Sequence, residues 1–141
     1  MSQETDNAAA GRRRRERAQG PRSGELQELV RTYDDELPQI IDEVVFGRLW
    51  DRPSLSHEDQ MLIAITALVI RDNQAQLRNY LFGALQDNIS VHKIRDLIIM
   101  TSAYGGMPVT INALQLLAEV VASLRRHGKN IPGEDDKPIG S

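Results

Sequence analysis

The segment from Met61 to Ile70 constrains the fold of this chain most strongly, because it is apolar throughout except for Thr66. A helix with this composition has no polar face, so we expect it to be buried on more than one side. The segment is too short to cross a bilayer, which takes about 20 apolar residues. Other apolar elements of the chain must therefore cover it.

The spacing of apolar residues predicts about six helices between residues 25 and 127. Aromatic residues make up only 4% of the chain, so the core must be aliphatic, which suits helix packing better than a sheet sandwich. Pro38 stands where a first helical residue would. Ser56, followed by Asp59 three residues later, resembles a capping box at the start of the apolar helix. We predict an all-α fold.

Charge divides the chain into three parts. Residues 1–24 carry six Arg against three acidic residues, including the run Arg12 to Arg15, and we expect a disordered Arg-rich tail. The alternative is that this run contacts nucleic acid or an anionic surface. Residues 25–127 form the single domain, with nine basic against fourteen acidic residues. Nucleic acid is not expected as a partner of this acidic body. Residues 128–141 are expected to form a flexible C-terminal tail.

The chain contains no cysteine, which excludes disulfides, thiol redox chemistry and cysteine-ligated metal sites. Its three histidines, His57, His92 and His127, do not have the spacing of a zinc site, so no metal is expected. The first residues include no apolar segment typical of a secretory signal. We expect a cytoplasmic protein with no membrane partner.

The last predicted helix has two apolar stripes and therefore calls for two packing partners. We expect one of them to be a second copy of the chain, which predicts a homo-oligomer. The alternative is one thick monomeric core. The first stripe consists of Ile111, Leu114, Leu117, Val121 and Leu124, and the second of Val109, Ala113, Leu116 and Val120.

Residues 40–122 carry an ordered set of motifs. They are W-x-R-P-x-L-S beginning at Trp50, a buried helix, a short helix ending in an Asn turn, S/T-x-x-x-I, and Y-x-G-x-P-x-x-x-x-A-L beginning at Tyr104. This order resembles the carboxymuconolactone decarboxylase family of the alkylhydroperoxidase-like superfamily. The resemblance implies an all-α subunit that assembles into a ring, as a trimer or hexamer, with pockets near the subunit contacts.

The family has two chemistries, and the sequence separates them. One branch uses a C-x-x-C pair, but residues 75–78 read AQLR here, so the chain is not a thiol peroxidase. The other branch releases carbon dioxide from a lactone carboxylate without a cofactor. The resemblance implies a cofactor-free carbon–carbon lyase that decarboxylates, isomerises or rearranges a small cyclic or lactone-type acid. The alternative is a non-catalytic member that binds a small molecule or another protein.

Two residues are the catalytic candidates. Tyr80 stands where the resemblance places the family's pocket histidine. With an ordinary pKa near 10, a tyrosine can donate a proton or a hydrogen bond but is a poor base at pH 7. Arg52 of the W-x-R-P motif could bind a substrate carboxylate through two hydrogen bonds. The alternatives are a Tyr80 ring that packs between helices and an Arg52 that caps helix carbonyls.

Three further residues are candidates for substrate binding. They are Trp50, Tyr104 and Asn112. Trp50 could instead pin its loop onto the core, Tyr104 could support the Gly turn that follows it, and Asn112 could be a polar point in a subunit contact. His57 lies outside the motifs, and we expect it to face solvent at the start of the apolar helix.

Overall fold

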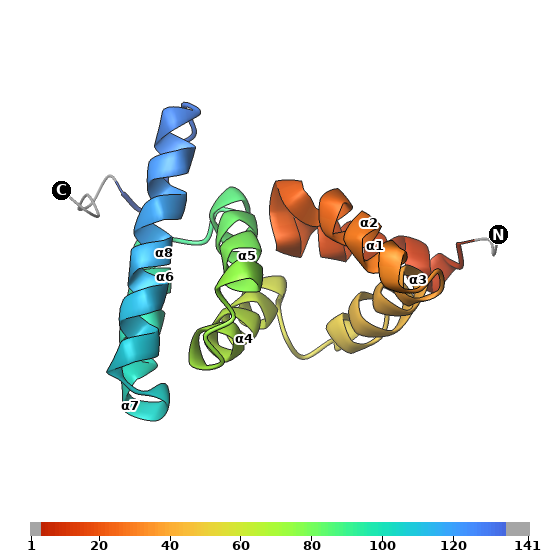
Figure 1. Ribbon diagram of the computed structural model, residues 1–141, viewed down its shortest axis with the longest axis horizontal. Helices are drawn as coiled ribbons and strands as arrows, with labels where there is room; N and C mark the ends of the chain where they lie inside the picture. The colour runs from red at the N-terminus through yellow and green to blue at the C-terminus, as the bar shows by residue number, and fades with distance from the viewer. Residues whose placement is uncertain (1–3, 135–141) are drawn as a thin grey trace.

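The computed structural model describes residues 4–134, and within them every regular element is a helix, which confirms the all-α prediction (Figure 1). The first group of elements is α1 (Asp6–Gln19), η1 (Gly20–Arg22), α2 (Ser23–Tyr33), α3 (Leu37–Ile40) and the π-helical η2 (Ile41–Phe46). The second group is α4 (His57–Ile70), α5 (Gln74–Gln86), α6 (Val91–Met100), α7 (Ser102–Gly105) and α8 (Met107–Arg126). The short helix η3 (Leu49–Asp51) lies in the connection between them.

The apolar helix predicted from the sequence is α4, which packs against α5, α6 and α8. Met61, Ile65 and Val69 are fully buried in the core. The opposite side is open in the single chain, where Ile63 is 56% exposed and Ile70 is also exposed. The expectation that α4 is buried on more than one side is therefore wrong for one chain, because no element of the described residues covers this side.

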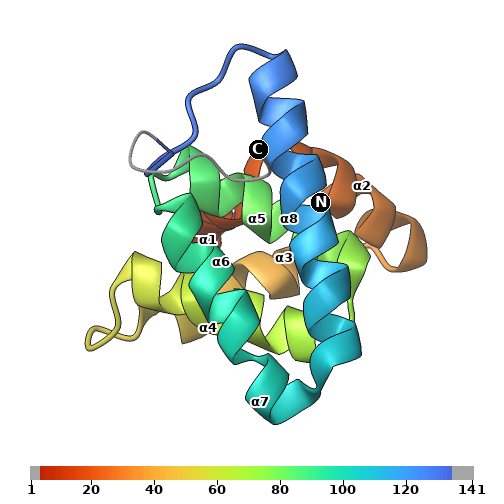
Figure 2. The ribbon, with the colours of Figure 1, turned by 90° about the vertical axis from the view of Figure 1, so that its left-hand side faces the viewer.

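Helix α8 runs beside α6, and α7 joins their ends (Figure 2). The later parts of both predicted stripes are buried within the chain, and only the start of α8 exposes large apolar side chains, at Met107 and Ile111. Among the described residues, α8 is the one helix long and apolar enough to cross a membrane, a test that the core helix of a soluble protein also meets. Its buried residues are Thr110, Ala113, Leu116, Leu117, Val120, Val121 and Leu124.

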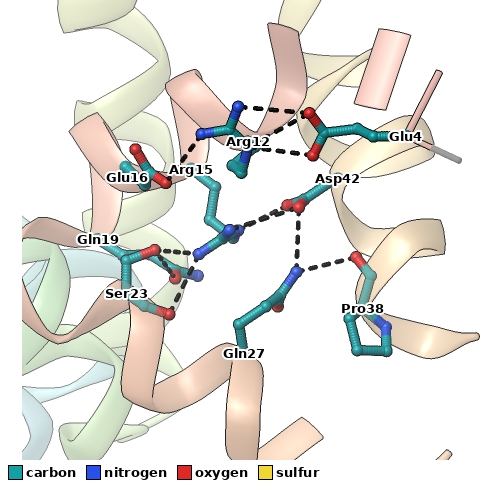
Figure 3. Close-up of polar contacts among 9 residues, drawn as sticks. All are labelled: Glu4, Arg12, Arg15, Glu16, Gln19, Ser23, Gln27, Pro38 and Asp42. Atoms are coloured by element: carbon teal, nitrogen blue, oxygen red, sulfur yellow. Dashed lines mark hydrogen bonds and ion pairs between the residues drawn. The ribbon is translucent and has the colours of Figure 1, made fainter. Parts of the chain in front are cut away.

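The expectation of a disordered tail at residues 1–24 is wrong for residues 6–24, which are helical, while residues 1–3 lie outside the described part of the chain. The physical reason is a buried polar network (Figure 3). The Arg15 side chain is 4% exposed, and its Nε donates to Asp42 Oδ1 at 2.6 Å. Gln27 donates to Asp42 Oδ2 at 3.1 Å, and Ser23 accepts from Arg15. Burial of a charge is tolerated because it is paired and hydrogen-bonded.

Helix α1 also crosses two other elements so closely that the backbones are in contact. A Cβ on Gly83 of α5 would lie 2.0 Å from the Ala18 carbonyl oxygen, and a Cβ on Gly11 would lie 1.7 Å from the Asp42 carbonyl oxygen. Only glycine permits such crossings. Helix α1 is therefore fixed against both η2 and α5, and it bridges the two groups of helices.

The C-terminal segment is also ordered as far as it is described. Ile131 is buried in the core, the Val91 amide donates to the Pro132 carbonyl at 2.8 Å, and Arg125 pairs with Glu134. The expected flexible tail is wrong for residues 128–134, because one apolar side chain, one backbone hydrogen bond to α6 and one ion pair hold them. Residues 135–141 lie outside the described residues.

Candidate functional site

The start of α4 is fixed by the predicted capping box. Ser56 Oγ accepts from the Asp59 amide at 3.0 Å, and Asp59 Oδ2 accepts from the Ser56 amide at 3.1 Å. These two hydrogen bonds satisfy two backbone amides at the helix start that would otherwise lack partners. The capping box makes His57 the first residue of α4. It also fixes the end of the preceding loop, which contains Arg52.

Three rings gather around Trp50 of η3. The Trp50 ring centroid lies 5.2 Å from that of Phe46, 5.9 Å from that of His57 and 6.4 Å from that of Tyr80. The Trp50 carbonyl accepts a 2.7 Å hydrogen bond from Gln60. Trp50 and Tyr80, two of the predicted site residues, thus lie in one cluster, and both also pack against the core.

A cavity of about 280 Å³ opens beside this cluster. Its volume is near the lower end of the range for small-molecule sites, so it suits a small organic acid. The residues that line it come from α1, η3, the following loop and the start of α4. They are Arg14, Arg17, Trp50, Asp51, Arg52, Pro53, Leu55, His57 and Gln60.

A larger hollow of about 750 Å³ lies between α1, α2 and α3. Its walls include Arg12 and Asp42, which already form ion pairs within the chain, and no aromatic residue. Paired charges are less available to a ligand than Arg52 of the smaller cavity, whose guanidinium has no hydrogen-bond or ion-pair partner among residues 4–134. We therefore take the smaller cavity as the candidate site.

The three arginines of the cavity differ in what they bind. Arg14 donates to Asp51 Oδ1 at 2.5 Å and to the Phe46 carbonyl at 2.9 Å. Arg17 donates to both carboxylate oxygens of Asp87, at 2.8 and 2.9 Å. The Arg52 side chain makes no hydrogen bond or ion pair with any residue in the described range 4–134, and its guanidinium is available to an anionic ligand.

The expectation that His57 faces solvent is wrong, because Trp50 of η3 and Asp87 at the end of α5 lie against it. Its side chain is 13% exposed, and Nε2 lies 3.4 Å from Asp87 Oδ2. The geometry is not that of a hydrogen bond, so Nε2 is buried without a hydrogen-bond partner. Burial lowers the pKa of His57, the charges of Arg17 and Arg14 also lower it, and Asp87 acts in the opposite direction.

Tyr80 does not line the cavity, although it contacts Trp50, which does. Burial raises the pKa of its phenol, and a hydrogen bond with Gln19 of α1 partly offsets that effect. The phenol is therefore protonated at neutral pH. The Tyr80 ring lies against Trp50 and so supports the cavity wall that Trp50 forms.

Tyr104 and Asn112 are not brought to the cavity. Tyr104 of α7 is 77% exposed. Asn112 of α8 donates to both oxygens of Asp72, at 3.2 and 3.4 Å, and so holds the turn between α4 and α5. Asp72 has a positive φ of 52°, so this turn needs support. The substrate-binding role of both residues stays a prediction.

No group of three or more His, Asp or Glu side chains in the range 4–134 is placed to hold a metal ion. The cavity instead combines one unpaired cation, one histidine and an aromatic wall. A comparison with known families gives this arrangement a context. The sequence profile of the carboxymuconolactone decarboxylase family matches residues 35–119. The chain belongs to this family.

Three known proteins are similar to this chain in sequence. A 4-carboxymuconolactone decarboxylase of Acinetobacter baylyi is 24% identical over 97 residues, which cover 69% of this chain and 72% of the relative. A nitrosuccinic acid decarboxylase of Metarhizium robertsii is 21% identical over 91 residues, 64% of each chain. An uncharacterised 15.0 kDa protein of Paracoccus denitrificans is 28% identical over 99 residues, which cover 69% of this chain and 71% of the relative.

The matched family segment begins after α1 and α2. Arg14, Arg17 and Gln19 therefore reach the site from outside the segment that defines the family. Sequence reasoning missed them because their contacts, Asp51, Asp87 and Tyr80, lie 37 to 70 residues further along the chain. It missed His57 for the same reason, since Asp87, which lies against it, is 30 residues further along the chain.

Proposed function

We propose that this protein is a cofactor-independent, decarboxylase-like carbon–carbon lyase of the cytoplasm that acts on a small cyclic or lactone-type organic acid. Family membership and two relatives that are named as decarboxylases support the reaction class. The observation that carries the proposal is the unpaired guanidinium of Arg52 at a small cavity walled by Trp50. A carboxylate is the ligand that such a group binds best.

The reaction breaks the bond between a substrate carbon and its carboxylate. The carboxylate leaves as carbon dioxide, the bonding electron pair stays on the carbon, and a proton then joins that carbon. Arg52 should not hold the departing carboxylate, because this charge disappears in the transition state and the ion pair would stabilise the ground state more. We assign Arg52 to a second carboxylate or to the oxygen that receives the electron pair.

The names of the two relatives suggest a substrate class. Nitrosuccinic acid and 4-carboxymuconolactone each carry two carboxylates and a nitro group or lactone carbonyl that can accept an electron pair. We propose the same chemistry for the substrate of this chain. Trp50 and Leu55 supply apolar wall, and Arg52 supplies the contact to the retained negative charge.

We further propose that the chain works as a homo-oligomer, a trimer or hexamer. Large apolar side chains remain exposed on α4, α6, α7 and the start of α8, where these helices meet around α7. They are Ile63, Ile70, Ile99, Met100, Tyr104, Met107 and Ile111. A group of exposed large apolar side chains is typical of a subunit contact.

A second candidate is a non-catalytic member of the family that binds a small molecule or a protein. The observation that favours it is Tyr80, whose phenol is buried beside Trp50 and contributes no group to the cavity. In that case the cavity would bind an acid without converting it.

Turnover of 4-carboxymuconolactone and nitrosuccinate, followed by proton NMR and by carbon dioxide release, tests the proposal. Loss of a charge-assisted hydrogen bond costs about 1.5 to 3 kcal/mol, so we expect Arg52→Gln to lower kcat/KM roughly 10- to 150-fold. Arg48→Gln is the matched control, because Arg48 is exposed and does not line the cavity. Tyr80→Phe should change kcat less than threefold if the phenol only supports Trp50.

Absence of turnover of both compounds by the wild type would remove the lyase proposal for this substrate class. A succinate-induced rise in melting temperature that Arg52→Gln abolishes and Arg48→Gln retains would then support the binding candidate. An equal rise in all three proteins would show that Arg52 is not the anion contact.

A further inference from the structure

We propose that His57 is the proton-transfer residue of this site and that Asp87 is its positioning residue. This inference rests on the proposed function, since a lyase of this class must return a proton to the carbon that loses carbon dioxide. His57 stands outside the family motifs found in the sequence, and neither the family match nor the relatives assign it a role.

His57 is the histidine that the fold brings to the cavity. It is the first residue of α4 and lines the cavity together with Arg52, and its ring centroid lies 5.9 Å from that of Trp50, with the ring planes tilted by 52°. His127 follows the end of α8, is exposed, and has its Nδ1 2.8 Å from the Ser123 carbonyl. Histidine is the side chain whose ordinary pKa suits proton exchange near neutral pH.

Asp87 is placed to hold the His57 ring in its protonated form. Its carboxylate accepts two hydrogen bonds from Arg17, which fix it at the end of α5, and its Oδ2 faces His57 Nε2 at 3.4 Å. In the neutral ring, Nε2 is buried without a hydrogen-bond partner. A proton on the ring would turn this contact into an ion pair, so the site is built to accept one.

The charges around the ring link its proton to the ligand. Arg14 and Arg17 face it from α1, Arg52 and Asp51 lie on the loop side, and Asp87 closes the end of α5. Burial and the two arginines of α1 lower the pKa of the ring below 6.5, so in the free protein it is neutral at pH 7. An anion on Arg52 adds negative charge nearby and favours uptake of a proton from solvent.

The cycle then balances without a further reactant. The substrate anion and one solvent proton enter the site, and the proton resides on His57. Carbon dioxide leaves, the remaining electron pair takes the proton from the ring, and neutral His57 remains. Net consumption is one proton for each carbon dioxide released.

Kinetics of His57→Gln test this role against His127→Gln as the matched control. We expect kcat to fall roughly 100-fold or more in His57→Gln, with KM changed less than threefold, and no change in His127→Gln. In the wild type, kcat/KM should decline as pH rises above the pKa of His57, and this decline should vanish in His57→Gln. Turnover by His57→Gln within threefold of the wild type would overturn the inference and leave the lyase proposal standing.

Asp87→Asn tests the positioning role. Asp87 raises the pKa of His57, so its removal should shift the decline in kcat/KM to lower pH. The double variant with His57→Gln should be no slower than His57→Gln alone. An unshifted pH profile in Asp87→Asn would remove Asp87 from the inference.

Calorimetric titration with succinate gives a readout that does not depend on turnover. Measurement in two buffers with different ionisation enthalpies counts the protons taken up on binding. We expect uptake in the wild type and His127→Gln, and its loss in His57→Gln with binding retained. Equal proton uptake in His57→Gln overturns the inference, whether or not the wild type converts either acid. Failure of succinate to bind the wild type removes the anion site on which both proposals depend.

Discussion

Arg17 and Asp87 join the first helix of the chain to the end of α5 through two hydrogen bonds, 70 residues apart in sequence. The same carboxylate faces His57 at the start of α4. One ion pair therefore couples the docking of α1 to the charge environment of the candidate site. The stability of this docking and the chemistry of the site should change together.

The crossing of α1 over α5 gives a direct test. Gly83→Ala places a methyl group 2.0 Å from the Ala18 carbonyl oxygen, which is backbone and cannot rotate away. We expect a loss of about 1 to 3 kcal/mol in the free energy of unfolding, and faster tryptic cleavage in the Arg12 to Arg15 run. Urea denaturation and limited proteolysis measure both. In Gly24→Ala, the control, the methyl group meets nothing within 4 Å, and we expect equal or slightly higher stability.

The buried network beneath α1 should be a major contributor to its order. Asp42→Ala leaves the Arg15 guanidinium buried with no carboxylate, and breaking such a pair costs about 3 to 5 kcal/mol. Arg13→Ala removes an exposed side chain and should change stability by less than about 0.5 kcal/mol. Chemical denaturation compares the two. Similar values for both variants would contradict the role assigned to the network.

The lowered pKa of His57 predicts a pH dependence of stability with a definite sign. The unfolded chain binds this proton more tightly than the folded chain, so the stabilisation is present above the ordinary pKa of 6.5 and is lost as pH falls below it. We expect the melting temperature of the wild type to fall more steeply between pH 7.5 and 5.5 than that of His57→Gln. Scanning calorimetry across this range measures it, with His127→Gln expected to follow the wild type.

The exposed apolar surface around α7 should mediate self-association. Met100 is 65% exposed at its edge, and Met100→Glu would place a charge in a subunit contact there. Light scattering after size exclusion should show an oligomer for the wild type and smaller particles for Met100→Glu. Arg126→Glu, at the exposed end of α8, should keep the wild-type mass. A monomeric wild type at all concentrations would contradict the oligomer proposal.

Much of the fold could be predicted from local patterns. The six helices expected between residues 25 and 127 correspond to α2, α3 with η2, α4, α5, α6 and α8. The capping box at Ser56 and Asp59 is present with both of its bonds. These features depend on neighbours within one turn of helix, so the sequence contains all the information that they need.

The errors at residues 6–24 and at His57 share one cause, which is long-range pairing. The sequence predicts a solvent-exposed Arg15, because its partner Asp42 lies 27 residues away on another element. His57 is mostly buried for a similar reason, because Asp87 at the end of α5 lies against it. For the site, the sequence pointed to Trp50, Tyr80 and Arg52, which lie at or beside the cavity. No local pattern indicated that Arg14 and Arg17 would complete its wall.

Helix α1 affects how the charge of the candidate site can change through substitution. It lies before the segment that defines the family, yet it supplies Arg14 and Arg17 to the cavity. Substitutions on this one helix can change the charge beside a ligand while the core of α4, α5 and α8 keeps its packing. Helix α1 thus has two faces with different constraints: Arg15 and Gly11 fix it on η2, while Arg14 and Arg17 at the cavity set the charge beside a ligand.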